Sequence, residues 1–281
     1  MGLAVAVAQA AVAVALALSA LAAHAAPPKQ TLVVCSPGSP GTTDEAQPRM
    51  DAFAAAVSAK AGTPLDAIYD PSEDGGVARL KTAGVGLVSL PFFLKHEQDL
   101  GLRARLQTVG KGRPALERWA LVVQKGRIKG PEGLAGMTVV SGVAFAPAFI
   151  RGPVLGGFGA LPGTAKLTQS TAVLSSLRRA ADGEPVAVLL DGTQEAQLAS
   201  LPFASKLEVV TRSPPLPAGL IVTIDARMPP KTWSGIEGAL VGLASDAAGA
   251  GVLDAILLSR FAPVDDKALD GARKAFADAS R

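Results

Sequence analysis

The chain of 281 residues is poor in cysteine, histidine and aromatic side chains. Its one cysteine excludes an internal disulfide and a cysteine-based zinc site, and its two histidines argue against a histidine-rich metal site. Lys and Arg outnumber Asp and Glu by only 27 to 24, and the basic residues are scattered without interleaved aromatics. Neither a metal nor a nucleic-acid partner is therefore expected.

Catalytic signatures are missing as well. The sequence has no G-x-S-x-G nucleophile elbow, no H-E-x-x-H helix and no G-x-x-x-x-G-K-[ST] phosphate loop. The glycine-rich run 156–159 follows a predicted helix, whereas a dinucleotide loop lies between a strand and a helix. Asp265 and Asp266 stand in a polar segment where solvation is the usual role of a carboxylate. We predict that the protein is not an enzyme and needs no cofactor.

Residues 1–25 contain no Lys, Arg, Asp or Glu and consist largely of Ala, Val and Leu. This composition predicts a secretory signal that ends in Ala23-His24-Ala25, although the usual basic start is missing. A retained membrane anchor is the alternative, because the run approaches the roughly 20 apolar residues that span a bilayer. Pro27 and Pro28 follow directly and favour cleavage. The expected product is a periplasmic protein without stable membrane insertion.

The rest of the chain alternates apolar strands with helical segments, and its hydrophobic share of 49% is ample for a core. Strands are expected at 31–35, 65–69, 85–90, 102–110, 118–125, 137–141, 165–168, 186–191, 206–211 and 219–224, with helices between most of them and three more at 230–245, 248–258 and 267–277. This spacing predicts an α/β fold with parallel sheets covered by helices. We expect two lobes, each a mostly parallel sheet flanked by helices: residues 26–125 with 213–281, and residues 126–212. Two crossovers would join them, with the ligand in between.

Four short motifs occur in a characteristic order along the chain. They are Ser-Leu-Pro-Phe-Phe at 89–93, Leu-Ala-Gly-Met-Thr-Val-Val at 134–140, Val-Ala-Val-Leu-Leu-Asp-Gly-Thr at 186–193, and Arg-Phe-Ala-Pro-Val-Asp-Asp-Lys-Ala-Leu at 260–269. Together they resemble the periplasmic phosphate, phosphite and phosphonate substrate-binding proteins of ABC transporters, over residues 31–276. The resemblance implies a type II periplasmic-binding fold, a small oxyanion-containing solute, and an ABC permease that receives it.

The same resemblance implies a set of ligand-binding residues at the ends of the strands. They are Ser36, Ser89, Phe92, Ser141, Gly142, Asp191 and Thr193. For Ser141-Gly142 the residues themselves point the same way, because a strand that feeds a helix at this point makes an anion pocket. Residues 143–146 lack the hydroxyls of the family's loop, and Glu73 and Asp74 add carboxylates. Both departures disfavour a doubly charged phosphonate.

Each of these residues also has a plain structural alternative. Asp191 and Thr193 suit the N-cap of a helix, and Phe92 suits a core. Cys35 is expected to be a buried small hydrophobe, and His96 is expected on a solvated helix face. For the whole chain, the alternative to solute binding is an interaction or sensory protein that kept the two-lobe fold without its ligand.

Overall fold

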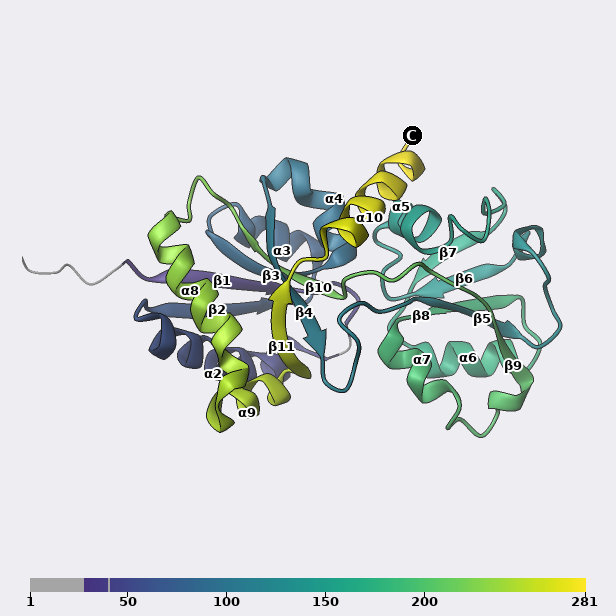
Figure 1. Cartoon of the computed structure of the whole chain (residues 1–281). Helices are drawn as coiled ribbons and strands as arrows, with labels where there is room; N and C mark the ends of the chain where they lie inside the picture. The colour runs from purple at the N-terminus through teal and green to yellow at the C-terminus, as the bar shows by residue number, and fades with distance from the viewer. Residues whose placement is uncertain (1–27, 40) are drawn as a thin grey trace, which may run out of the picture.

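The computed structural model describes residues 28–39 and 41–281, so the expected secretory signal at 1–25 lies outside the described residues. The chain forms two lobes that stand side by side in Figure 1, each built on one β-sheet. The expected two-lobe α/β architecture is confirmed. Within the described residues no single helix is long and apolar enough to cross a membrane, and Pro230–Ser245 with Ala247–Ala255 meets that test only as a pair bent by 97°.

The first lobe holds a six-stranded sheet of order β11-β4-β10-β3-β1-β2. The strands are β1 (Gln30–Cys35), β2 (Leu65–Asp70), β3 (Val85–Ser89), β4 (Arg103–Gly110), β10 (Gly219–Thr223) and β11 (Leu258–Pro263). β1 pairs in parallel with β2 and β3, but β10 and β11 run antiparallel to their neighbours. The sheet is therefore mixed and not mostly parallel, because β10 enters from the second lobe at the end where β3 finishes.

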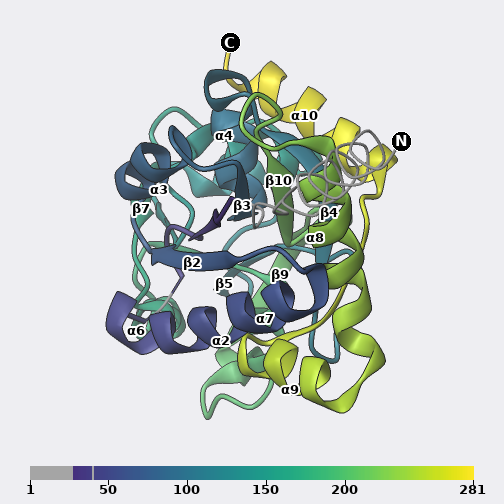
Figure 2. The ribbon, with the colours of Figure 1, turned by 90° about the vertical axis from the view of Figure 1, so that its left-hand side faces the viewer.

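Helices cover both faces of this sheet, as Figure 2 shows. One face carries α2 (Thr43–Ala61), α8 (Pro230–Gly242) with the 3-10 turn η4 (Leu243–Ser245), and α9 (Ala247–Ala255). The other face carries α3 (Glu73–Leu80), α4 (Leu90–Leu100) and the C-terminal α10 (Asp266–Ala279). Local sequence sets the ends: Thr42 and Glu45 form a capping box before α2, and Gly62 closes it in the left-handed conformation.

The second lobe holds a five-stranded sheet of order β7-β6-β8-β5-β9. Its strands are β5 (Ala120–Gln124), β6 (Thr138–Ser141), β7 (Lys166–Gln169), β8 (Val186–Leu190) and β9 (Leu207–Arg212). The helix α5 (Pro147–Phe149) and its π-helical continuation η2 (Ile150–Val154) pack on one face, and α6 (Val173–Ala181) packs on the other. α7 (Gly192–Leu198) follows β8, and the turns η1 (Pro131–Leu134) and η3 (Ala204–Lys206) complete the lobe.

The chain passes between the lobes at residues 111–119 and 213–218. Between them, Glu117 and Leu216 form an antiparallel pair with two main-chain hydrogen bonds of 2.8 Å. Trp119 and Ser213 extend this ribbon, since the Trp119 N–H donates to Ser213 Oγ and the Ser213 N–H donates to Trp119 O. β5 pairs with β8 and β9, which puts it in the second sheet although the expected boundary at 125/126 assigns it to the first lobe.

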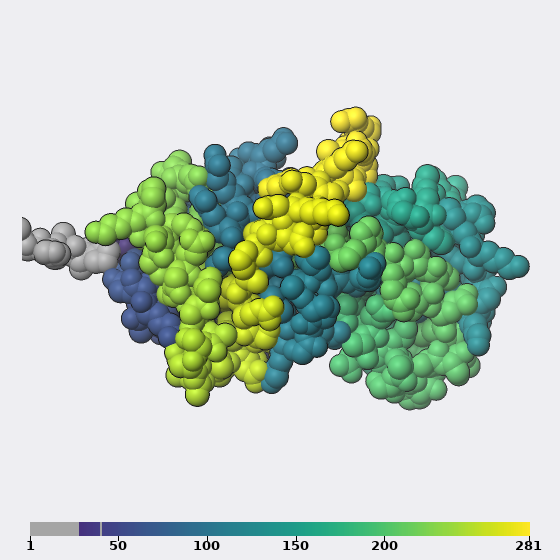
Figure 3. Space-filling view, viewed as in Figure 1, coloured from purple at the N-terminus to yellow at the C-terminus, as the bar shows by residue number. Residues whose placement is uncertain are grey.

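The C-terminal helix α10 runs from the first lobe onto the second, as the space-filling view in Figure 3 shows. On the first lobe Arg273 forms an ion pair of 2.6 Å with Glu97 of α4. On the second lobe Gly152 of η2 lies so close to the main chain of Ala275 that a side chain there would clash with its carbonyl group. Leu269 and Ala272 belong to one core cluster with Phe149, so the hydrophobic core is continuous across the lobes.

The strand β11 was not expected from the sequence, which predicted a helix at 248–258 and no strand after it. Arg260 and Pro263 interrupt any apolar alternation in this segment. It becomes a strand because it pairs with β4, and because the ring of Phe261 lies 5.8 Å from that of Phe53 in the core. Only a tertiary contact decides this element.

Candidate ligand-binding cleft

A cavity of about 220 Å³ lies between the lobes, where both chain crossings meet. Its lining comes from the loop after β1, the start of α4, the crossing strands, the loop after β6 and the start of α7. These residues are Ser36, Pro37, Gly38, Ser39, Ser89, Pro91, Glu117, Trp119, Gly142, Val143, Asp191, Thr193, Gln194 and Ala218. Five of the seven expected ligand-binding residues thus line one cavity: Ser36, Ser89, Gly142, Asp191 and Thr193.

The first lobe contributes hydroxyl groups. Ser36 and Ser39 form a hydrogen bond of 2.8 Å between their Oγ atoms. Ser89 is the N-cap residue of α4, yet its side chain makes no capping hydrogen bond. The Oγ atom of Ser89 is buried and has no hydrogen-bond partner among the residues that the structure describes. A buried hydroxyl without a partner costs free energy, so its place in a cavity wall points to a group that would fill the cavity.

The second lobe contributes the start of α7. Asp191 caps this helix: its Oδ1 accepts the Gln194 N–H at 2.8 Å, and the Gln194 side chain accepts the Asp191 N–H at 3.1 Å. The N-cap role that the sequence suggested for Asp191 is confirmed, and the side chain of Gln194 makes it a reciprocal capping box. Burial raises the pKa of Asp191 even though the Gln194 and Thr193 N–H groups and Arg113 favour its ionised form. Asp191 therefore caps α7 and also lines the cavity.

Glu117 brings a second carboxylate to the cavity from the hinge. Burial and the nearby charge of Asp191 raise its pKa to about 7, against the opposing effects of the Gly192 N–H and Arg113. Arg113 itself donates to the Thr193 carbonyl at 3.2 Å and does not line the cavity. The cleft therefore holds two carboxylates and several hydroxyls, with no basic side chain among its described lining residues.

The carboxylates expected to oppose an anion, Glu73 and Asp74, do not line this cavity. Glu73 is paired with Lys95 at 2.6 Å and with His96 at 2.7 Å on the surface between α3 and α4. His96 was expected to be solvated, but its side chain is 14% exposed and its ring lies 4.7 Å from that of Phe92. The negative charge of the cleft comes from Glu117 and Asp191.

Two expected site residues lie outside the cavity wall. Phe92 is fully buried in the first-lobe core, which is the structural role that the sequence offered as the alternative to ligand binding. Ser141 is 1% exposed, and its Oγ accepts the Val143 N–H at 3.3 Å. The next residues, Gly142 and Val143, reach the cavity instead. Because β6 ends at Ser141, the side chain that was expected to bind the ligand orients the loop that does line the cavity.

The lobes are closed on each other in this structure. Gly38 has a φ of +83° and lies against the main chain of Gly142, with no room for a side chain between them. Lys95 of α4 donates to the Phe145 carbonyl of the second lobe at 2.8 Å. With the Arg113 contact to Thr193, these interactions join the lobes around the cavity.

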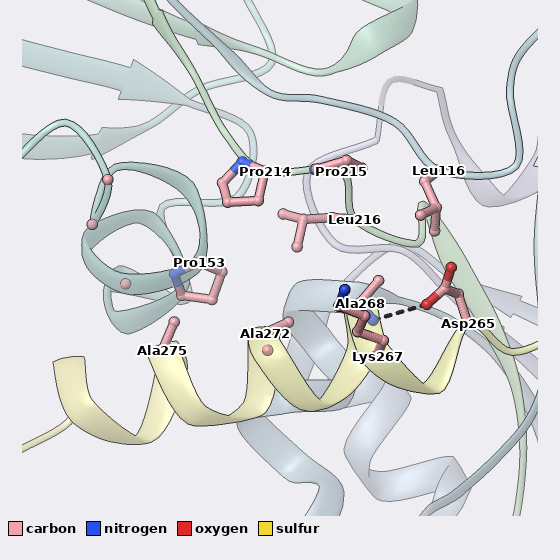
Figure 4. A pocket seen from close by; sticks show the side chains of 14 residues that line it. Leu116, Pro153, Pro214, Pro215, Leu216, Asp265, Lys267, Ala268, Ala272 and Ala275 are labelled. Atoms are coloured by element: carbon pink, nitrogen blue, oxygen red, sulfur yellow. Dashed lines mark hydrogen bonds between the residues drawn. The ribbon is translucent and has the colours of Figure 1, made fainter.

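A larger hollow of about 540 Å³ lies on the other side of the hinge, and Figure 4 shows it from close by. It is walled by α10, by the η2 turn and by residues 214–216, and its lining is almost wholly Pro, Gly, Ala and Leu. Asp265 and Lys267 are its two charged residues, and Asp265 is used as the N-cap of α10. This hollow lacks the convergent polar groups that fix a small solute, which the cleft has.

Solved structures with the same arrangement are known. XAC2383 from Xanthomonas citri matches with a TM-score of 0.70 in its chloride-bound structure and 0.71 in its ATP-bound structure, at 15% and 14% identity, over 89% of this chain and 98% of that one. The binding protein component of an ABC phosphonate transporter from Pseudomonas aeruginosa matches with 0.66 and 14% identity, over 90% and 87%. PhnD1 from Prochlorococcus marinus, in complex with methylphosphonate, matches with 0.63 and 14%, over 89% and 98%.

The fold is that of a two-lobe periplasmic binding protein. At such low identity these matches establish the arrangement of the chain and not its ligand. No protein-family model and no curated protein sequence matches the chain. The ligand must therefore be inferred from the residues of the cleft itself.

Sequence reasoning missed several lining residues, among them Ser39, Trp119, Gln194 and above all Glu117. Trp119 packs edge-on against Phe149 at 5.5 Å, and it also lines the cavity. Glu117 lies in the polar stretch between two predicted strands, where a lone carboxylate has no local signal. Its position gave no clue either, because the lobe boundary was expected at 125/126 and the chain crosses earlier.

Proposed function

We propose that this protein is a periplasmic solute-binding protein that encloses one small solute between its lobes. The observation that carries the proposal is the cavity of about 220 Å³, which both lobes line and which contains the unpartnered Oγ of Ser89. The two segments that cross between the lobes are hydrogen-bonded to each other at Glu117 and Leu216. The lobes can rotate as rigid bodies about this short ribbon. Closure removes water from the cavity, so that few hydrogen bonds suffice to hold a solute.

The solute that this wall suits carries an oxyanion group of low charge. The hydroxyls of Ser36, Ser39 and Ser89 are donors from the first lobe, and the loop at Gly142 faces them from the second. A dianion such as an ionised phosphonate would meet the carboxylates of Glu117 and Asp191 without a basic side chain among the described lining residues to balance it. The structural likeness to binding proteins of ABC transporters supports delivery of the solute to a permease.

The test is a thermal-shift screen of the purified protein against phosphate, phosphite, alkylphosphonates, sulfate, sulfonates and amino acids. A solute that binds the folded state alone raises the melting temperature by mass action, by an amount that grows with its concentration. Small-angle scattering with and without the solute should show a compact, closed particle in its presence. If no solute shifts the melting temperature, the alternative of an interaction protein that kept the fold gains the support instead, and turnover of any solute would favour an enzyme.

A further inference from the structure

The charges inside the cleft are of one sign. Glu117 and Asp191 are the charged residues of the lining, and they approach from different elements, the hinge and the start of α7. The loop after β1 and the start of α4 face them with uncharged groups from Ser36 to Ser39, Ser89 and Pro91. Arg113 is the cation near both carboxylates, from the loop before the hinge. An oxyanion in the cavity is repelled by both carboxylates, and more strongly than it would be in water.

The two carboxylates are not equivalent. Asp191 is committed as an acceptor, because its Oδ1 receives the Gln194 N–H and closes the capping box of α7. That role stabilises its ionised form. Glu117 faces one main-chain N–H, that of Gly192, and its main chain is fixed by the pair with Leu216, so its side chain stays at the hinge beside the cavity. One main-chain N–H favours the ionised form of Glu117 and two favour that of Asp191, so protonation of Glu117 disturbs fewer contacts.

Resting on the proposed function, we propose that Glu117 determines the charge of the solute: it takes up one proton from solvent when a singly charged oxyanion enters, and donates it as a hydrogen bond to that oxyanion. No bond of the solute is broken. The proton removes one repulsion and turns an acceptor into a donor. The Ser89 Oγ, unpartnered on the opposite lobe, supplies a second donor. A dianion would leave an unbalanced charge and is rejected.

A titration near neutrality agrees with this role, since burial and Asp191 raise the pKa of Glu117 to about 7. Below that pH the empty cleft already carries the proton, and binding is independent of pH. Above it, each molecule of solute must bring a proton from water. The affinity for a monoanion should then fall tenfold per pH unit, by linkage.

The experiment uses methanesulfonate, whose single negative charge does not change between pH 5.5 and 8.5, and ethylammonium, a single positive charge over the same range. Calorimetric titrations of the full chain are run at pH 6, 7 and 8, in two buffers of different ionisation enthalpy so that proton uptake is counted. Glu117→Gln is a permanently neutral donor at the same place. Glu132→Gln, on an exposed residue of η1 in the second lobe, is the matched control.

For the unaltered protein and Glu132→Gln, we expect methanesulfonate affinity to fall about fivefold from pH 7 to pH 8, with uptake of close to one proton at pH 8. For Glu117→Gln we expect an affinity that does not change with pH and no proton uptake. The proposal is overturned by a methanesulfonate affinity that is flat with pH in the unaltered protein, by a pH dependence that persists in Glu117→Gln, by ethylammonium binding tighter than methanesulfonate binding, or by failure of methanesulfonate to bind. In each case a solute found in the thermal-shift screen would leave the solute-binding function standing.

Discussion

Gly38 of the first lobe and Gly142 of the second meet main chain to main chain at the cleft, and a methyl group on Gly142 would lie 2.7 Å from the Gly38 carbonyl oxygen. This contact is possible only because neither residue has a side chain. It ties the closed form of the protein to two particular positions in two loops, one after β1 and one after β6.

Gly142→Ala should therefore hold the lobes apart. Overpacking of this kind costs about 1–3 kcal/mol, which corresponds to a loss of solute affinity of roughly 5- to 150-fold. The free energy of unfolding should change little, because the clash is relieved when the lobes open. Small-angle scattering of the variant with saturating solute would show a larger radius of gyration. Gly163→Ala is the control, since nothing lies within 4 Å of a methyl group there; an unchanged affinity for Gly142→Ala would show that the contact does not govern closure.

Ser89→Ala should have opposite effects on stability and binding. Removal of a buried hydroxyl without a partner leaves the ligand-free protein as stable as before or more stable, by up to about 1 kcal/mol. If the Oγ binds the solute, the affinity drops by roughly 2- to 10-fold through loss of one neutral hydrogen bond. Thermal unfolding with and without solute measures both quantities. A drop in stability without solute would mean that the hydroxyl has a partner in the unliganded protein.

The two roles of Asp191 can be separated by two substitutions. Asp191→Ala removes the cap of α7 and should lower the free energy of unfolding by about 0.5–2 kcal/mol. Asp191→Asn keeps the cap, because Asn is as good an N-cap as Asp, and removes the charge. Chemical denaturation should therefore rank the alanine variant below the asparagine variant. Equal loss in both would show that the charge and not the cap stabilises this helix.

Stability should depend on pH through Glu117. Its pKa is raised to about 7 in the folded protein, so between the unfolded value near 4.5 and about 7 the folded state binds the extra proton. The free energy of unfolding thus falls as the pH rises through this window, by at most about 3 kcal/mol. Denaturation curves of Glu117→Gln should lack this component. An identical pH profile for the variant and the unaltered protein would contradict the assignment.

Cys35 should be inert to thiol reagents in the folded protein. It is fully buried, and burial together with the nearby Asp70 and Glu73 charges raises the pKa of its thiol to about 12. The thiolate that reacts is therefore almost absent at pH 8. Labelling with an aromatic disulfide reagent should be negligible without denaturant and should reach one thiol per chain in denaturant. Fast labelling of the native protein would mean that the first sheet opens at this strand.

Much of the fold was readable from the chain alone, because local signals and tertiary structure agree there. The alternation of apolar strands and helices predicted both lobes. The N-cap residues Thr42 and Asp191 set where α2 and α7 begin. The residues at the strand ends were predicted to meet in one cleft, and Ser36, Ser89 and Asp191 do so. These features depend on periodicity and on hydrogen bonds between neighbours in sequence, which a sequence displays directly.

The remaining features were decided by contacts between distant segments. β11 is a strand because β4 offers it a partner, and β5 belongs to the second sheet because β8 and β9 flank it. Because β6 ends at Ser141, the Ser141 side chain is buried and the next residue, Gly142, lines the cavity. The charge of the cleft depends on Glu117, which only the antiparallel pairing with Leu216 carries to the cavity. Sequence alone determined most of the elements; the packing of the two lobes decided which side chains share the cleft, since burial and proximity arise only when the chain is folded.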